Sequence, residues 1–196
     1  MKKKRGQLQE NTEVTKINFG CGTNLLEDYL NIDAVDISAS GKFHFKQSDL
    51  LNPQELPNDF FTEIKAQMVF EHIHPDLIPS VIYTMSCLLQ MNGMIYVTVP
   101  NYAYFAKQFM SVHENFNNFT LKNLTCMREA MFQLLDPMIK MDSSTAYRGH
   151  QSFWTPAMAN YWFQGEGFVI KNMVENKPIL TFIALKKDKY SVAKNV

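Results

Sequence analysis

The stretch that decides the fold is Lys16–Asp36, KINFGCGTNLLEDYLNIDAVD. A short apolar run meets a tight glycine turn, Gly20-Cys21-Gly22, and a second short run ends at Asp33. This order of strand, glycine turn, strand and acid is typical of a doubly wound sheet that holds a nucleoside. Glycines let the backbone approach a ligand closely, and the acid accepts hydrogen bonds from ribose hydroxyls.

The spacing within this stretch narrows the kind of ligand. A dinucleotide site has glycines at the first, third and sixth positions and an acid about 20 residues on. Here Leu25 is at the sixth position and the acid comes early. Residues 21–28 are too few for a usual crossover, so we expect a first helix of only one or two turns. Such a helix offers little N-terminus for a pyrophosphate, which favours a ligand with adenosine but no phosphates.

Composition sets broad limits on the protein. A chain of 196 residues is long enough for one well-packed domain. Its formal net charge of zero argues against a global basic field for nucleic acid. Cys21, Cys87 and Cys126 lack metal or disulfide spacing, which predicts reduced thiols in a cytoplasmic protein. No apolar run reaches membrane-spanning length, none follows the basic Lys2–Arg5 as in a signal peptide, and residues 1–13 are expected to be a flexible polar tail.

Apolar periodicity and turn residues predict the elements along the chain. Strands are expected at 14–20, 29–34, 42–46, 65–70 and 94–99. A helix is expected to begin with Asp76 as N-cap and to end at Met91-Asn92-Gly93, where Gly93 can take a positive φ. A second helix should begin at Thr155-Pro156, and a closing antiparallel hairpin is expected from 168–174 and 179–185.

Residues 102–154 interrupt the alternation of strands and helices. Aromatic residues crowd the first part, and apolar residues then recur at helical spacing from 121 to 138. An insertion after the fifth strand lies at the carboxyl edge of the sheet, where open α/β sheets bind their ligands. We therefore expect a helical, aromatic insertion that acts as a lid.

Three segments together resemble the class I S-adenosyl-L-methionine (SAM)-dependent methyltransferases. FGCGTN followed by LNIDAVD resembles the first two motifs of the family, in its small members with a shortened first helix. MVFEHIHPDLIPSVIYTMSCLLQMNGMIYVTVPN is similar to the stretch from fourth to fifth strand, except that Met91 and Asn92 replace Pro and Gly. GHQSFWTPAMANYWFQGEGF resembles a late segment of the family. The resemblance covers roughly residues 15–100 and 146–187.

The resemblance implies a single α/β domain over residues 1–196. Its sheet would be Rossmann-like, mainly parallel and seven-stranded, with strand order 3-2-1-4-5-7-6, helices on both faces and the insertion after the fifth strand.

The resemblance also implies SAM as cofactor. Asp33 would accept the ribose hydroxyls, Asp49 the adenine amino group, and the backbone N–H of Leu50 would meet an adenine ring nitrogen. Gly20 and Gly22 would pass beside the methionine part. The other expected cofactor contacts are Asn18, which replaces the family's usual acid, Cys21 and Phe70.

SAM is already activated, so the protein must mainly align the acceptor and, for a hydroxyl, remove its proton. A histidine is the obvious base. We predict His150 as the base, with Glu71 or His72 positioning the acceptor, while a purely structural role stays open for each histidine. His44 and His113 are not favoured.

A metal is not expected from the sequence. Glu71-His72 is similar to a pair in metal-dependent small-RNA and ubiquinone-pathway O-methyltransferases, which have a further Glu three residues earlier. That position is Met68 here, and a thioether is a poor ligand for hard cations.

The predicted function is methyl transfer from SAM to an unidentified acceptor. Neutral charge and the aromatic insertion favour a small molecule or carbohydrate, while nucleic acid and protein acceptors stay open; no membrane partner is expected. The alternative is a non-catalytic module of the same fold that binds a nucleoside or a partner protein. Turnover of SAM would separate the two.

Overall fold

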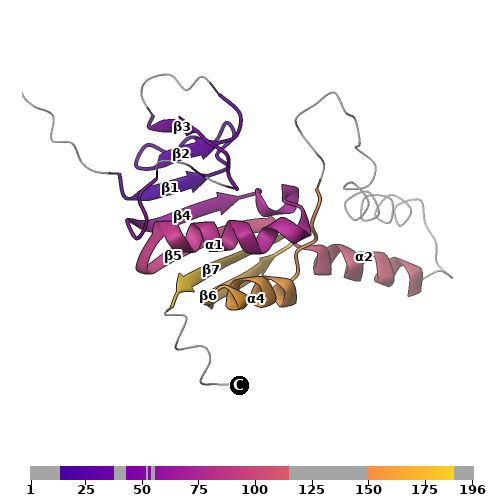
Figure 1. The fold of residues 1–196 in the computed structure, drawn as a ribbon. Coiled ribbons are helices and arrows are strands. Elements are labelled where there is room, and N and C mark those ends of the chain that lie inside the picture. The colour runs from indigo at the N-terminus through magenta and orange to yellow at the C-terminus, as the bar shows by residue number, and fades with distance from the viewer. Residues whose placement is uncertain (1–13, 38–42, 52, 54–55, 115–149, 188–196) are drawn as a thin grey trace, which may run out of the picture.

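The computed structural model describes residues 14–37, 43–51, 53, 56–114 and 150–187 (Figure 1). Seven strands form one sheet in the order β3-β2-β1-β4-β5-β7-β6. The strands are β1 (Lys16–Phe19), β2 (Leu30–Asp33), β3 (Phe45–Gln47), β4 (Phe61–Gln67), β5 (Leu89–Pro100), β6 (Phe168–Asn176) and β7 (Ile179–Lys186). The five strands from β1 to β5 are parallel, and β7 runs antiparallel to both β5 and β6. The predicted α/β fold and strand order are confirmed.

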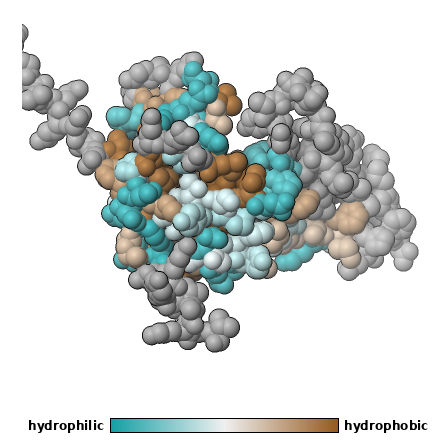
Figure 2. All heavy atoms as spheres, viewed as in Figure 1, coloured by the Kyte–Doolittle hydropathy of each residue, from teal (hydrophilic) through white to brown (hydrophobic). Residues whose placement is uncertain are grey.

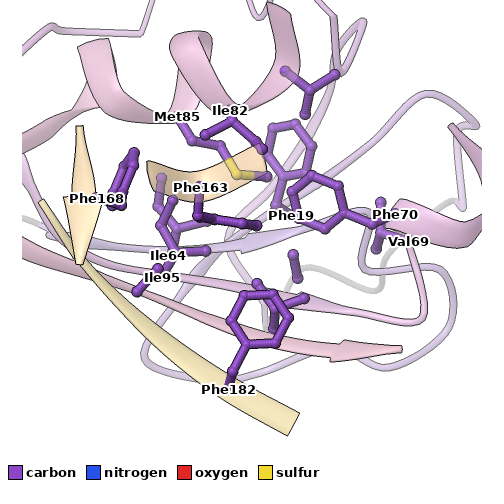
Figure 3. Packing of buried hydrophobic residues seen from close by; sticks show 14 of the residues in the cluster. Phe19, Ile64, Val69, Phe70, Ile82, Met85, Ile95, Phe163, Phe168 and Phe182 are labelled. Atoms are coloured by element: carbon purple, nitrogen blue, oxygen red, sulfur yellow. The ribbon is translucent and has the colours of Figure 1, made fainter. Parts of the chain in front are cut away.

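One face of the sheet carries the core. α1 (Ile78–Leu88) and α4 (Pro156–Gly165) lie side by side over this face (Figure 1). Figure 3 shows Phe163 of α4 in the middle of the cluster, with Phe168 on one side and Phe19 and Phe70 on the other. All four rings are fully buried, so this face supplies most of the apolar burial that stabilises the fold.

The opposite face is more polar. Its strand residues, such as Lys65, Tyr96 and Ile183, are half-buried. In the described part of the chain no helix packs on this face, because α2 (Tyr102–Glu114) leaves the carboxyl end of β5 and runs away from the sheet (Figure 1). Helices were expected on both faces of the sheet. Among the described residues they cover only one face. Tyr29 covers part of the bare face, where its hydroxyl donates to Glu63 and the Lys65 ammonium lies 4.6 Å from its ring centroid.

The first crossover contains turns but no helix, where one or two helical turns were expected. A buried asparagine pair replaces the helix. Asn18 Nδ2 donates to Asn31 Oδ1 (2.9 Å) and to the carbonyl of Asn24 (2.7 Å). Asn31 accepts from the Leu26 N–H and donates to the carbonyls of Leu26, Tyr29 and His44. These side chains satisfy backbone groups that a helix would otherwise have paired internally.

Several predicted element boundaries are wrong. β4 spans Phe61–Gln67 where 65–70 was expected, because Met68 takes a positive φ (+54°) that ends the strand. His74, not Asp76, is the N-cap of a short 3₁₀ turn, η2 (Pro75–Leu77), that leads directly into α1. β5 begins at Leu89, well before the expected start, and Asn92 takes the positive φ (+63°) that was assigned to Gly93. Gly93 is needed for space instead, because an added Cβ would lie 2.8 Å from Leu89 Cδ2.

The predictions for the end of the chain are confirmed. Thr155 caps α4 by accepting from the Met158 N–H, with Pro156 at the first helical position. β6 and β7 form the expected antiparallel hairpin. The tail at 1–13 and the stripe at 121–138 lie outside the described residues.

Figure 2 shows hydrophobic residues in small patches among hydrophilic ones on the face that carries α1 and α4. None of the described helices is long and apolar enough to cross a membrane.

Candidate functional site

The glycine turn lies at the carboxyl edge of the sheet, directly after β1. Both glycines have positive φ, +63° at Gly20 and +48° at Gly22, a region that residues with a side chain seldom adopt. A Cβ at Gly20 would lie 2.7 Å from Val69 Cγ2, so the turn packs tightly on the loop after β4. A Cβ at Gly22 would meet no atom within 4 Å. The turn is thus closed on one side and open at Gly22, as a site for a bound molecule requires.

Asp33 ends β2 beside this open position. Its carboxylate accepts from the Gly22 N–H (Oδ2, 2.8 Å) and from the Val35 N–H (Oδ1, 3.0 Å). A carboxylate oxygen has two lone pairs, so each oxygen can accept one further hydrogen bond. The predicted ribose acid is therefore held in place by the glycine turn itself.

Asp49 and Leu50 follow β3 at the same edge. The Ser48 N–H donates to the Asp33 carbonyl (2.9 Å), which sets the chain direction after the strand. Asp49 is exposed, and its Oδ1 accepts from the Leu51 N–H (2.9 Å). Leu50 is half-buried and packs against the core. The structure thus brings both predicted adenine contacts to the edge that carries Asp33.

Three other predicted cofactor contacts have little accessible side chain. Asn18 is 2% exposed, and its amide nitrogen donates to the Asn24 carbonyl in the crossover and to Asn31 in β2. Phe70 is fully buried between Trp154 and Phe163, with ring centroids 5.3 and 5.7 Å away. The thiol of Cys21 is also buried, and burial, with the charge of Asp33 as a smaller cause, raises its pKa to about 11. The structure gives the Asn18 and Phe70 side chains structural roles.

Glu71 lies in a short 3₁₀ turn after β4, η1 (Phe70–His72). Its side chain has no exposed surface, and neither Oε1 nor Oε2 has a hydrogen-bond partner among the described residues. Burial raises the pKa of this carboxyl from its ordinary value of 4.5 to about 7. A buried, unpaired acid is unusual in folded proteins and marks this turn as a candidate reactive position.

The segment that follows the insertion is held against η1 by backbone hydrogen bonds. The N–H groups of Gln151 and Ser152 both donate to the Glu71 carbonyl, at 2.6 and 3.1 Å. Gln151 Nε2 donates to the His72 carbonyl, and Ser152 Oγ donates to the Phe70 carbonyl. These bonds fix the position of His150, which directly precedes Gln151.

Glu71, His72 and His150 therefore form one cluster. One ligand atom from each, a carboxylate oxygen or an imidazole nitrogen, lies within 4.8 Å of the other two. The two imidazole rings meet edge to face, with centroids 5.0 Å apart. The structure thus brings together all three predicted catalytic residues. His44 and His74 are exposed elsewhere, and the His113 side chain lies outside the described residues.

Tyr102, the first residue of α2, completes the surroundings of His150. Its hydroxyl lies 2.9 Å from His150 Nδ1, and only 3% of the residue is exposed. Phe153 packs edge to face on the Tyr102 ring at 4.8 Å, and Phe105 contacts the ring at 6.2 Å. An aromatic group therefore borders the acidic and imidazole side chains.

Sequence reasoning missed Asn31 and Tyr102. For Asn31 a signal existed, because a polar residue inside a buried strand needs a partner and Asn18 occupies the matching position one strand away. For Tyr102 no local signal existed, since its contact with His150 joins two ends of the insertion.

Comparisons with known proteins were made for sequence and for structure. No family profile and no curated protein matches the sequence. Solved structures do match the fold. A SAM-dependent methyltransferase from Mesorhizobium loti is 13% identical, with a TM-score of 0.57 over 87% of this chain and 90% of that chain. One from Methanosarcina mazei is 11% identical, with a TM-score of 0.58 over 87% and 91%.

A third similar structure contains bound molecules. The 1,6-didemethyltoxoflavin-N1-methyltransferase of Burkholderia thailandensis, with 1,6-didemethyltoxoflavin and S-adenosylhomocysteine bound, is 12% identical, with a TM-score of 0.51 over 88% of this chain and 70% of that chain. At such identities the likeness concerns the fold. This chain has the fold of the class I SAM-dependent methyltransferases.

Proposed function

We propose that this protein binds SAM at the carboxyl edge of its sheet and transfers the methyl group to an acceptor held beside Glu71, His72 and His150. The observation that carries the proposal is the composition of this edge. The glycine turn bonded to Asp33 follows β1 and β2, and the buried cluster follows β4. The fold shared with SAM-dependent methyltransferases supports the same reading.

The cofactor would lie across the first three strands. The backbone at Gly20 and Gly22 would run beside the methionine part of SAM, and Asp33 would accept the ribose hydroxyls with its remaining lone pairs. Asp49 would accept from the adenine amino group, and the Leu50 N–H would donate to a ring nitrogen. We retain Cys21 only through its backbone, because its thiol is buried.

The chemistry would be an in-line displacement. The acceptor oxygen forms a bond to the methyl carbon as the carbon–sulfur bond breaks, and the sulfonium leaves as the neutral thioether of S-adenosylhomocysteine. The acceptor proton passes to His150, which acts as general base. Glu71 or His72 would hold the acceptor in line with the methyl group.

The proposed acceptor is a small molecule or a carbohydrate. The buried ring of Tyr102 lies beside His150, and the half-buried Phe105 and the exposed Phe153 pack on it. Such aromatic surroundings suit small ligands. The Burkholderia thailandensis enzyme, by its name, methylates a small molecule, which supports this class. A cytoplasmic location remains a prediction from the cysteines.

Calorimetry with SAM tests the cofactor site. A charge-assisted hydrogen bond contributes about 1.5–3 kcal/mol, so Asp33→Ala should weaken SAM binding by roughly 10- to 150-fold. Asp33→Asn tests charge with little change in shape, and Asp28→Ala changes an exposed acid of the same crossover as a control. Unchanged SAM affinity in a folded Asp33→Ala protein would refute the site.

Turnover separates an enzyme from a non-catalytic binding module. With an acceptor identified by screening, His150→Ala should lower the rate by about 10²–10⁴ while SAM affinity stays unchanged. A protein that binds SAM but transfers no methyl group to any small molecule, sugar, protein or nucleic acid would support the alternative of a non-catalytic module. Normal turnover by His150→Ala and His72→Ala would indicate an amine or thiol acceptor that needs no base.

A further inference from the structure

The starting point is the unpaired acid in η1. Glu71 is fully buried, and in the part of the chain that the structure describes neither carboxylate oxygen has a hydrogen-bond partner. Almost all buried polar atoms in folded proteins are paired, and an unpaired one indicates a missing ion or water. Buried charges are usually paired or bind metals. When ionised, the Glu71 carboxylate therefore needs a positive partner, which the described side chains around it do not supply through a hydrogen bond.

Two imidazoles stand beside this acid. The ligand atoms of Glu71, His72 and His150 all lie within 4.8 Å of one another. Bonds of about 2.0–2.2 Å in a tetrahedral arrangement would put ligand atoms about 3.4 Å apart. The ligand atoms must therefore approach one another by up to about 1.4 Å, a shift within the reach of rotation about the χ angles of these side chains. Gln151 holds that backbone through its bonds to the Glu71 and His72 carbonyls.

The orientation of His150 fits the same use. A histidine that binds a metal through one ring nitrogen normally has its other nitrogen in a hydrogen bond. Here Nδ1 of His150 lies 2.9 Å from the Tyr102 hydroxyl, so donation from Nδ1 leaves the lone pair on Nε2. Tyr102 would then be a positioning residue for a metal-binding histidine.

We propose that Glu71, His72 and His150 bind one divalent transition-metal ion, for which Zn²⁺ is the best match. One carboxylate and two imidazoles are an established zinc donor set that leaves a coordination position for water or an acceptor oxygen. Mg²⁺ prefers oxygen ligands and would be bound less well. Ion binding does not itself require methyl transfer; it rests on the proposed function only in lying on the acceptor side of that site. With Nδ1 bonded to Tyr102 and Nε2 on the ion, His150 could not also accept the acceptor proton, so the ion would replace it in that role by lowering the pKa of a bound acceptor hydroxyl.

This proposal revises the metal-free reading of the sequence. That reading depended on Met68, which removes one candidate ligand next to Glu71-His72. It placed His150 with Glu71 and His72 as the candidate base but did not count it as a ligand, and the structure adds that the segment after the insertion is bonded directly to η1.

The test is a titration of the EDTA-treated full chain with Co²⁺, followed by competition with Zn²⁺. We expect one equivalent of Co²⁺ with visible absorption bands of nitrogen and oxygen ligation, displaced by Zn²⁺. Glu71→Gln, His72→Ala and His150→Ala should each weaken binding by more than about 100-fold, and Tyr102→Phe by about 10- to 100-fold. His44→Ala and His74→Ala change exposed histidines outside the cluster and should leave it unchanged.

Three results would overturn the proposal. These are no Co²⁺ or Zn²⁺ binding by the folded protein, unchanged binding in His150→Ala, and a sulfur-to-cobalt charge-transfer band, which would place the ion on a cysteine. Circular dichroism and SAM calorimetry in EDTA show whether each variant folds. Loss of the ion site with SAM binding intact refutes only this inference, whereas metal binding without SAM binding refutes only the proposed function.

Discussion

Glu71 shows how one residue links stability to the site. Burial raises the pKa of its carboxyl from 4.5 to about 7, so the folded protein binds this proton more tightly than the unfolded chain does. Between pH 4.5 and 7, Glu71 is therefore protonated in a larger fraction of folded molecules than of unfolded chains. The stability of the ion-free protein should therefore fall as pH rises from about 4.5 to 7, by about 3 kcal/mol in total.

Glu71→Gln tests this linkage, because an amide cannot ionise. In EDTA, the unfolding free energy of the wild type should fall between pH 4.5 and 8. This fall should exceed that of the variant by about 3 kcal/mol. Urea unfolding at several pH values measures both curves. Parallel curves for the two proteins would show that Glu71 does not titrate between these pH values.

For single residues, the sequence predicted which side chains lie at the carboxyl edge better than it predicted which of them are buried. Asp33, Glu71, His72 and His150 were predicted at the carboxyl edge, and the structure places them there. Asn18 and Phe70 were predicted as cofactor contacts, but both are buried in structural roles. A motif position identifies the residue, whereas exposure depends on which distant segment packs over it.

Among the elements, the first crossover depends on the Asn18–Asn31 pair. Asn31→Ala would leave the carbonyls of Leu26, Tyr29 and His44 without this donor. A buried group left unpaired costs about 1–3 kcal/mol, so we expect a loss of about 3 kcal/mol in unfolding free energy. Hydrogen exchange should quicken at residues 21–28 more than in β4. Asn24→Ala, an exposed change in the same crossover, is the control.

The glycine turn gives a second test of an element. Gly20→Ala places a methyl group 2.7 Å from Val69 Cγ2 and forces alanine into positive φ. Clash and strain should together lower the unfolding free energy by about 2–4 kcal/mol. Adding Val69→Ala should recover the part due to the clash but not the part due to φ. A double variant no better than the sum of both single losses would contradict the contact.

Helix starts differ in how well the sequence predicts them. α4 begins where Thr155-Pro156 predicts, because the cap and the fixed proline φ act locally. α1 begins later than predicted, because His74 caps η2 first. The missing first helix was only half predicted. The short spacing predicted a helix cut to one or two turns, whereas its full replacement by asparagine side chains depends on pairing between strands.

For the whole molecule, the order of the strands is the property least visible in local patterns. Periodicity predicted that seven strands exist and roughly where they lie, but the order 3-2-1-4-5-7-6 followed only from family resemblance, and the structure confirms it. Pairs such as Val97 with Phe182 join residues far apart in the chain. No propensity of either residue specifies such a partner.

Hydrogen exchange over the whole chain tests the predicted lid. β5 is bonded on both sides, to β4 and β7, whereas α2 runs away from the sheet and its Met110 is 51% exposed. Amides of residues 102–141 should therefore exchange faster than those of β5 in the ligand-free protein and slow when SAM or acceptor binds. Equal protection in the ligand-free protein would contradict a lid.

The hydrogen bond between Gly22 and Asp33 also affects the kinetics of cofactor binding. The turn is already fastened before any cofactor arrives, so the first phase of SAM capture should need no rearrangement of the turn, and closure of the lid would follow as a separate phase. In stopped-flow fluorescence, the observed rate of this first phase should rise linearly with SAM concentration. A plateau would reveal a slow conformational step. Asp33→Asn, which removes the charge that holds the turn, should introduce that plateau, so that the wild-type acid makes cofactor capture fast as well as tight.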